Sequence, residues 1–293
     1  MSWWKGLKGR LRLKEPLKRH TTFKVGGPAR FFIEPLSIGD LRLLCAAAKK
    51  YKLRFFPIGS GSNILAADKV FGAIVMQLSS PLFKRTSFDR NNLEVGSGLP
   101  LGRLIQKTIS RGLSGLEFLS GIPGTVGGAL AMNAGCWGKN IGPLVEKALV
   151  MDYNGKIIAI DKKDIKFTYR NSSLSKYIIL SAHLKLIKKN RAEIKEEISR
   201  CLNLRKSSQD KSYPSAGCVF KNPPYDSAGR LIDLCGLKGK RIGGACISTK
   251  HANFILNKGN ARAADVLRLM SLIKRTVKRK FNITLEPEIK IWQ

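Results

Sequence analysis

Gly121-Ile-Pro-Gly-Thr-Val-Gly-Gly-Ala-Leu-Ala-Met-Asn-Ala-Gly-Cys-Trp-Gly138 is the stretch of sequence that decides the fold. It is dense in glycine and carries no charged residue. Glycine lets a backbone approach another molecule closely. Thr125 and the backbone N–H groups around it, leading into a short helix near Ala129, would suit a bound pyrophosphate. A buried, tightly turned loop packed against a sheet accounts for the same glycines about equally well.

A second glycine loop, Gly59-Ser60-Gly61-Ser62-Asn63, follows the apolar run 55–58 and favours the ligand-binding interpretation. Two such loops in one chain suggest one large phosphorylated ligand held between them. The second loop lacks the third glycine of a dinucleotide-binding Rossmann motif, and the chain continues as a strand rather than a helix. A Walker loop is also absent from the sequence. A nucleotide bound here would therefore not be held by either of these common motifs.

Length and composition indicate a globular protein of two medium domains, or one large domain with an appendage. The chain has 293 residues, of which 43% are hydrophobic. We find no apolar run long enough for a transmembrane helix and no signal peptide. The six cysteines form no Cys-x-x-Cys pair and do not cluster with the three histidines. We therefore expect no zinc site and a reduced, cytoplasmic protein.

The net charge of +33 raises the alternative of nucleic-acid binding. The basic residues are spread along nearly the whole chain, with no RNA-recognition signature, so we expect no specific nucleic-acid partner. Residues 1–19 form a basic extension that includes Trp3 and Trp4. This extension could touch an anionic membrane surface, but we favour loose packing on its own domain because Gly6, Gly9 and Pro16 weaken any helix.

The pattern of apolar residues predicts a β-α-β unit first and hairpins later. Residues 30–33 and 54–58 read as strands around a helix over 41–50, followed by strands at 74–78 and 93–95 and a helix after Pro100. Asn154-Gly155 predicts a hairpin between 148–152 and 156–160. Further strands are expected at 167–169, ending at Arg170, and at 177–186. Helices are expected at 190–206, 228–235 and 261–280, with a strand near 253–256.

Three further places could carry chemistry, although each has an ordinary structural explanation. Arg170 ends a short strand, where a surface ion pair would be commonplace. Cys218 follows a small flexible turn, and a lone cysteine is usually a small core residue. Glu288 belongs to Glu286-Pro-Glu288, which closes the last predicted strand and could be an ordinary solvated end.

Taken together, these motifs resemble the UDP-N-acetylenolpyruvoylglucosamine reductases, also called UDP-N-acetylmuramate dehydrogenases, of peptidoglycan synthesis. The resemblance covers about residues 15–293 and rests on motifs in the family's order: His20-Thr-Thr-Phe-Lys-Val-Gly-Gly-Pro-Ala, Gly59-Ser-Gly-Ser-Asn, Gly121-Ile-Pro-Gly-Thr-Val-Gly-Gly-Ala, Met132-Asn-Ala-Gly, Tyr169-Arg-Asn-Ser, Ser215-Ala-Gly-Cys-Val-Phe-Lys-Asn-Pro, His251-Ala-Asn-Phe and Pro287-Glu288.

The resemblance implies an α+β fold with a two-part FAD-binding domain of the vanillyl-alcohol oxidase (PCMH) type. A smaller α+β substrate-binding domain would follow, with boundaries at residues 20–188 and 189–293. FAD would be held non-covalently, with NADPH as the hydride donor. The implied cofactor-binding residues are Gly59, Ser60, Gly61, Ser62, Asn63, Gly121, Ile122, Pro123, Gly124, Thr125, Gly127, Gly128 and Asn133.

The resemblance also implies roles in catalysis and substrate binding. Arg170 and Glu288 match residues that stabilise an enol intermediate, and Cys218 matches the proton donor, which is serine in many members. Contacts to the substrate, UDP-N-acetylglucosamine enolpyruvate, fall on Arg205 or Lys206, Lys221 and Asn222. The short segment between Arg170 and Cys218 resembles the subtype without a long substrate-covering loop, and we expect a monomer. The rival functions are a related flavin oxidase acting on another substrate and a basic nucleic-acid-binding protein.

Overall fold

A computed structural model describes residues 3–293 and divides the chain into two compact units. The first unit comprises the described residues up to Leu13, then Phe31–Ser60 and Gly72–Asn203. The second comprises Lys14–Arg30, Gly61–Phe71 and Leu204–Gln293. These contact-based units differ from the predicted boundaries at 19/20 and 188/189, because two N-terminal segments group with the C-terminal residues. The predicted boundaries separate an FAD-binding domain from a substrate-binding domain, and this functional division stays a prediction.

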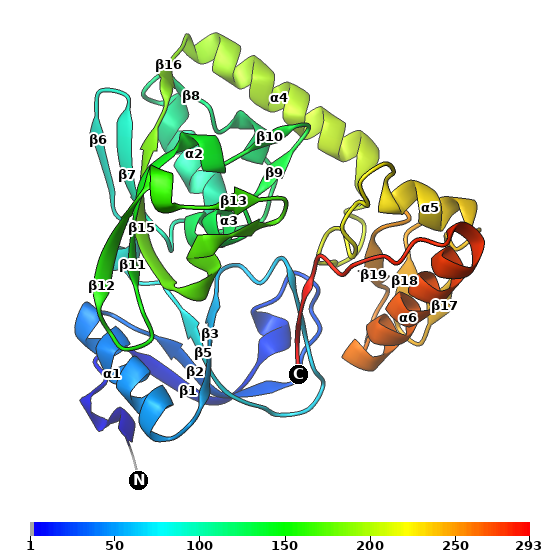
Figure 1. Cartoon of the computed structure of the whole chain (residues 1–293), viewed down its shortest axis with the longest axis horizontal. Coiled ribbons are helices and arrows are strands. Elements are labelled where there is room, and N and C mark those ends of the chain that lie inside the picture. Colours follow the sequence, from blue (N-terminus) through cyan, green and yellow to red (C-terminus); the bar gives the residue numbers. More distant parts are fainter. Residues whose placement is uncertain (1–2) are drawn as a thin grey trace. The chain divides into compact units, whose positions relative to one another are not determined.

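A four-stranded sheet and one helix open the first unit (Figure 1). The strand order is β1-β2-β5-β3, with β3 parallel to β5. The strands are β1 (Arg10–Pro16), β2 (Pro28–Glu34), β3 (Arg54–Ile58) and β5 (Phe71–Gln77), and the helix is α1 (Ile38–Lys50). The Ser37 side chain caps α1 by accepting a hydrogen bond from the amide of Asp40. The predicted β-α-β unit is confirmed, except that β5 lies between its two strands.

The N-terminal tryptophans pack on this sheet. The rings of Trp3 and Trp4 lie 5.4 and 5.8 Å from the ring of Phe31 in β2. The favoured interpretation of these two residues, packing on their own domain, is therefore confirmed. No helix among residues 3–293 is both long enough and apolar enough to cross a membrane.

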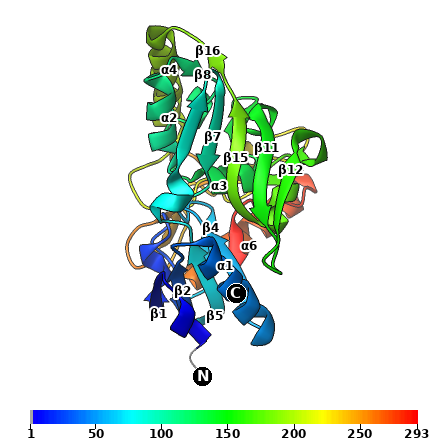
Figure 2. The same ribbon diagram turned by 90° about the vertical axis from the view of Figure 1, so that its left-hand side faces the viewer.

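A five-stranded antiparallel sheet carries the largest core of the first unit, with strands β7, β15, β11 and β12 side by side in Figure 2. The order is β12 (Ile157–Asp161), β11 (Val145–Met151), β15 (Ile178–Lys185), β7 (Asn92–Gly96) and β6 (Thr86–Asp89). The predicted Asn154-Gly155 hairpin joins β11 to β12, and Gly155 has the positive φ of +86° that such turns need. Helices α2 (Leu101–Ile109) and α3 (Val126–Ala131) pack their buried faces into the same core.

Short elements complete the first unit. Three two-stranded pairs are β8 (Leu113–Ser114) with β16 (Ile187–Lys188), β9 (Gly135–Cys136) with β10 (Lys139–Asn140), and β13 (Phe167–Thr168) with β14 (Asn171–Ser172). The 3₁₀ helices of the chain are η1 (Trp3–Gly6), η2 (Leu17–Arg19), η3 (Pro81–Lys84), η4 (Glu117–Leu119), η5 (Gly142–Leu144), η6 (Lys162–Asp164) and η7 (Ser173–Lys176). Arg170 lies in the tight turn between β13 and β14, with a φ of +56°, and not at the end of a longer strand as predicted.

The second unit is a small α+β body. It contains the antiparallel sheet β17 (Arg241–Ile242), β18 (Ala245–Ile247) and β19 (Ile255–Asn257), the parallel pair β4 (Ile64–Ala66) and β20 (Lys290–Trp292), and helices α5 (Ala228–Leu234) and α6 (Ala263–Phe281). The predicted helix at 261–280 is α6, and its buried apolar residues pack with Phe23, Val25 and Leu65 from the N-terminal segments. The predicted helix at 190–206 is α4 (Arg191–Ser208).

Candidate functional site

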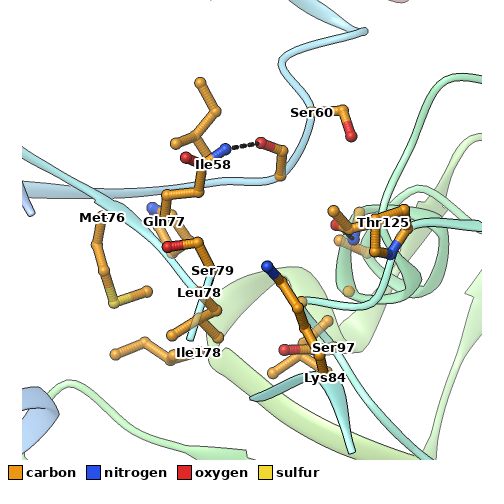
Figure 3. A pocket seen from close by; sticks show the side chains of 18 of the residues that line it. Ile58, Ser60, Met76, Gln77, Leu78, Ser79, Lys84, Ser97, Thr125 and Ile178 are labelled. Carbon is orange, nitrogen blue, oxygen red and sulfur yellow. Dashed lines mark hydrogen bonds between the residues drawn. The ribbon is translucent and has the colours of Figure 1, made fainter. Parts of the chain in front are cut away.

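A pocket of about 300 Å³ lies in the first unit beside both glycine loops (Figure 3). Five predicted cofactor residues line it: Gly59, Ser60, Thr125, Gly127 and Gly128. The other lining residues come from the ends of β3 and β5, from residues 97–100, from 175–179 around the start of β15, and from Lys84 and Ala131. The expectation that the two glycine loops border one ligand space is supported within this unit.

The two loops touch at Gly59. A Cβ placed on Gly59 would lie 2.5 Å from Oγ1 of Thr125, so only glycine permits this approach. The side-chain amide of Gln77 donates a hydrogen bond of 2.8 Å to the carbonyl oxygen of Gly59 and fixes the start of the Gly59–Asn63 loop on β5. This loop therefore has a defined position against the loop that contains Thr125.

The amides at the start of α3 differ from the sequence-based expectation. Those of Val126 and Gly127 donate to the carbonyl oxygens of Leu99 and Ser97, at 3.0 and 2.8 Å. Those of Gly128 and Ala129 donate to Oγ1 and the carbonyl oxygen of Thr125, at 3.3 and 2.9 Å. All four N–H groups are thus engaged within the protein, and the helix start is not an open cradle for a pyrophosphate.

Other polar groups of the pocket do fit a phosphorylated cofactor. The Ser97 side chain is 3% exposed, and its hydroxyl has no hydrogen-bond partner among residues 3–293. In the same described part of the chain, the Ser60 amide donates no hydrogen bond. Because buried polar groups are normally paired, these donors suit a ligand rich in oxygen acceptors. Lys84, also in the lining, adds a positive charge.

Eight predicted cofactor residues do not line this pocket: Gly61, Ser62, Asn63, Gly121, Ile122, Pro123, Gly124 and Asn133. Asn133 is buried and its side chain holds local structure, donating to the carbonyl of Thr168 and accepting from the amide of Gly142. Asn63 belongs to the second unit, where its side chain donates to the carbonyl of Glu288. Direct cofactor contacts by these eight residues stay predictions.

Sequence reasoning missed the pocket residues Gln77, Lys84, Ser97, Gly98 and Tyr177. One signal could have found two of them. Gly96-Ser97-Gly98 repeats the Gly-Ser-Gly pattern of residues 59–61, again at the end of a strand. A lysine, a glutamine and a tyrosine in ordinary surroundings carry no such signal.

The motifs around Arg170 and residues 130–135 come together in the first unit. Nη1 of Arg170 donates to the carbonyl of Gly135 at 2.9 Å, and the hydroxyl of Ser172 donates to that of Leu130 at 2.7 Å. The guanidinium also lies 5.1 Å from the ring centroid of Tyr169. A positive φ is uncommon for arginine and costs some backbone strain. The hydrogen bond to Gly135 and the contact with Tyr169 offset this strain and hold the guanidinium in one place.

Cys218 and Glu288 come together in the second unit. Cys218 forms an isolated antiparallel bridge with Phe254, and the amide of Glu288 donates to the carbonyl of Val219 at 2.8 Å. Both side chains are half-buried. The predicted proton donor and the predicted carboxylate are therefore on adjacent backbone segments. Arg170 belongs to the first unit.

Asn253 fixes the backbone that carries Cys218. Its buried side chain accepts from the amide of Phe220 at 2.9 Å and donates to the carbonyl of the same residue at 2.8 Å. His251, two residues earlier, accepts from the Asn253 amide through Nδ1. Burial lowers the pKa of His251 below its ordinary value, so the ring is neutral at pH 7.

The predicted substrate-binding residues differ in accessibility. Lys206 is exposed, whereas Arg205 is only 4% exposed. Nζ of Lys221 lies 3.1 Å from a carboxylate oxygen of Glu286, in an exposed ion pair. The side-chain oxygen of Asn222 accepts from the amide of Ala228 at the start of α5. All four residues are in the second unit, and Lys206, Lys221 and Asn222 are accessible to solvent whereas Arg205 is buried.

Comparison with known families and proteins gives consistent matches along the chain. The family described as "UDP-N-acetylenolpyruvoylglucosamine reductase, C-terminal domain" matches residues 208–292, and that described as "FAD binding domain" matches residues 29–161. The chain is 42% identical to the UDP-N-acetylenolpyruvoylglucosamine reductase of Caldanaerobacter subterraneus, covering 97% of this chain and 94% of the relative. It is 44% identical to that of Caldicellulosiruptor bescii, with 94% and 88% covered.

Solved structures agree with these matches. The UDP-N-acetylenolpyruvylglucosamine reductase of Thermus caldophilus is 36% identical, with a TM-score of 0.82, over 98% of this chain and 100% of that one. A solvent-stable cholesterol oxidase matches 62% of this chain and 38% of its own length at 16% identity and a TM-score of 0.52. At that identity the likeness concerns the fold alone.

Proposed function

The chain belongs to the family of the UDP-N-acetylenolpyruvoylglucosamine reductases, and from this premise we propose how its residues carry out the reaction. It is an FAD-dependent UDP-N-acetylmuramate dehydrogenase of peptidoglycan precursor synthesis that uses NADPH. Its fold is the predicted one, a PCMH-type FAD-binding domain followed by the family's C-terminal domain. The observation that carries the assignment is the match over nearly the whole chain, together with two glycine loops that border one pocket.

FAD, when bound, accepts hydride from NADPH and passes it to the enolpyruvyl double bond. We assign its binding to the pocket of the first unit. Gly59 and Gly127 allow the walls of this pocket to pack closely on Thr125 and Ser97, and the amide of Ser60 and the hydroxyl of Ser97 provide hydrogen-bond donors there. These contacts would orient the cofactor without a covalent bond.

Arg170 would stabilise the negative charge that develops on the substrate. Hydride addition to the terminal carbon places charge on the carbon conjugated to the carboxylate. A guanidinium can meet a carboxylate with two parallel N–H bonds, which suits this charge. The anchoring of Nη1 on the carbonyl of Gly135 supports this role, because it limits the movement of the fork.

Cys218 would then donate its thiol proton to that carbon, and Glu288 would hold the enol by a hydrogen bond. The new C–H bond forms as the S–H bond breaks, and the thiolate regains a proton from water. The placement of both residues on adjacent backbone segments supports a shared role. Only the protonated thiol can donate, because the thiolate has no proton to give.

Lys206, Lys221 and Asn222 would contact the UDP-sugar. Among the alternatives Arg205 and Lys206, exposure supports Lys206. A positive charge and an amide are the groups that a diphosphate and a uracil ring prefer. We further propose that the enzyme is a cytoplasmic monomer of the subtype without a long substrate-covering loop and that it has no specific nucleic-acid partner.

The first experiment is an absorption spectrum of the purified protein, followed by an assay. We expect flavin bands and NADPH oxidation that depends on UDP-N-acetylglucosamine enolpyruvate. A colourless protein that cannot take up FAD would contradict the assignment. Turnover of an alcohol with O₂, without NADPH oxidation, would instead favour a flavin oxidase. Tight, selective binding of nucleic acid at physiological salt would favour a basic nucleic-acid-binding protein.

A further inference from the structure

The pyrophosphate of FAD needs partners that the start of α3 does not supply. The first four amides of that helix donate within the protein, to Leu99, Ser97 and Thr125. A pyrophosphate carries two negative charges, and neutral donors alone meet them less strongly than a cation does. A cation in the pocket lining would therefore strengthen binding beyond what the neutral donors supply.

Lys84 is the only charged side chain among the described residues that line the pocket. The amino end of its side chain points into the space between Ser79 and Thr125 (Figure 3). No acidic side chain among residues 3–293 pairs with it. The residue is half-buried, so its charge is screened by water less than that of the many exposed lysines.

The backbone on both sides of Lys84 is fixed. The carbonyl of Phe83 accepts from the amide of Gly98 at 2.8 Å, and that of Arg85 accepts from the amide of Gly96 at 2.9 Å. A Cβ on Gly96 would lie 2.3 Å from the Phe83 carbonyl oxygen, so only glycine allows the approach. The end of η3 is thus held directly against the end of β7, and Lys84 is the side chain that this contact presents to the pocket.

We propose that Lys84 pairs with the pyrophosphate of FAD and holds the cofactor in place. This inference rests on the function proposed above. The lysine is a positioning residue for the cofactor and takes no part in hydride or proton transfer. Its aliphatic stem would pack against the lining, and its ammonium group would meet the negative charge between the two glycine loops.

The test uses the purified holoenzyme and follows flavin fluorescence as FAD is released after dilution. Lys84→Met keeps the length and the apolar stem but removes the charge. We expect it to release FAD roughly 10-fold faster or more, the scale of one lost charge-assisted hydrogen bond. Release from the parent should accelerate as NaCl rises, and release from Lys84→Met should accelerate less. Lys84→Arg should restore slow release.

Arg85→Met is the matched control. It makes the same change in net charge one residue further on, where the side chain is exposed and does not line the pocket. Equal release rates and equal salt dependence in Lys84→Met and Arg85→Met would overturn the inference. Unchanged FAD release with weakened NADPH binding in Lys84→Met would overturn it too. A parent protein without flavin would contradict the proposed function itself, which separates the two failures.

Discussion

At the scale of single residues, neighbouring glycines in the cofactor pocket serve different purposes. A Cβ on Gly127 would lie 2.9 Å from Cβ of Ser97, whereas one on Gly128 would lie 3.5 Å from its nearest neighbour, Oγ1 of Thr125. Neither glycine has a positive φ. Close approach to Ser97 is therefore what requires glycine, and it does so only at position 127.

We predict that Gly127→Ala loses FAD and Gly128→Ala keeps it. In Gly127→Ala the contact between α3 and the end of β7 must open, which displaces the Ser97 hydroxyl from the pocket wall. The measurement is the ratio of flavin to protein absorbance after gel filtration, with circular dichroism as the check on folding. Full flavin occupancy in folded Gly127→Ala would contradict the prediction.

A second residue-scale prediction concerns Cys218. If its thiol is the proton donor, Cys218→Ala should leave reduction of the flavin by NADPH nearly intact. Reoxidation by the enolpyruvyl substrate should slow by roughly 10²-fold or more, the usual effect of losing a general acid. Cys218→Ser should retain much of the activity and resist alkylating reagents, because it lacks the nucleophilic sulfur. Stopped-flow measurement of the two half-reactions decides; reoxidation of Cys218→Ala at the parent rate would make Cys218 a packing residue.

Some residues of the pocket could be predicted from the sequence and others could not. The glycine loops were recognisable because glycine at high density is unusual, and Thr125 came with them. Lys84 was not recognisable, because 53 of the 293 residues are lysine or arginine and most are exposed. Lys84 differs from the other basic residues because its backbone neighbours accept hydrogen bonds from Gly96 and Gly98, which places its side chain at the pocket. These contacts exist only in the folded chain.

At the scale of elements, the short segments that carry Cys218 and Glu288 depend on side-chain hydrogen bonds. These segments are too short for a regular sheet, and Asn253 substitutes for part of one by pairing with both backbone groups of Phe220. Strands β11 and β12 were predictable from sequence, because the Asn154-Gly155 turn signal lies between two apolar runs. The isolated bridges at Cys218 and Phe220 were not, since a bridge of this length has no periodicity.

We predict that Asn253→Ala destabilises the protein by about 1–3 kcal/mol, the cost of leaving a buried backbone N–H and C=O without partners. Asn222→Ala is the control. That side chain is exposed and makes one hydrogen bond, to the amide of Ala228, so we expect a loss of at most about 1 kcal/mol. Urea unfolding followed by circular dichroism measures both variants. Equal stability of the parent and Asn253→Ala would show that water replaces the amide.

At the scale of the whole molecule, the second unit is assembled from three separate parts of the chain. Phe23 and Val25 come from Lys14–Arg30, Leu65 comes from Gly61–Phe71, and the rest of the core comes from the C-terminal region. Sequence periodicity indicated α5, α6 and a strand near β19, but not the short strands β17 and β18. It also did not indicate which segments of the chain join to form this unit. Membership depends on contacts across some 200 residues of sequence, as between Thr22 and Ser215, which are 193 positions apart.

This arrangement sets an order of events during synthesis on the ribosome. Translation delivers the N-terminus first, so Phe23 and Val25 leave the exit tunnel long before the residues around α6 that enclose them exist. A nascent chain stalled just after α4 has emerged should carry a protease-resistant first unit while Lys14–Arg30 is still cut. Release of the complete chain should then protect that segment, and limited proteolysis of stalled chains can follow the change. Early protection of Lys14–Arg30 would mean that this segment packs on another part of the nascent chain before α6 is made. Otherwise, the apolar side chains of Phe23 and Val25 stay exposed to solvent until the last third of the protein has been synthesised.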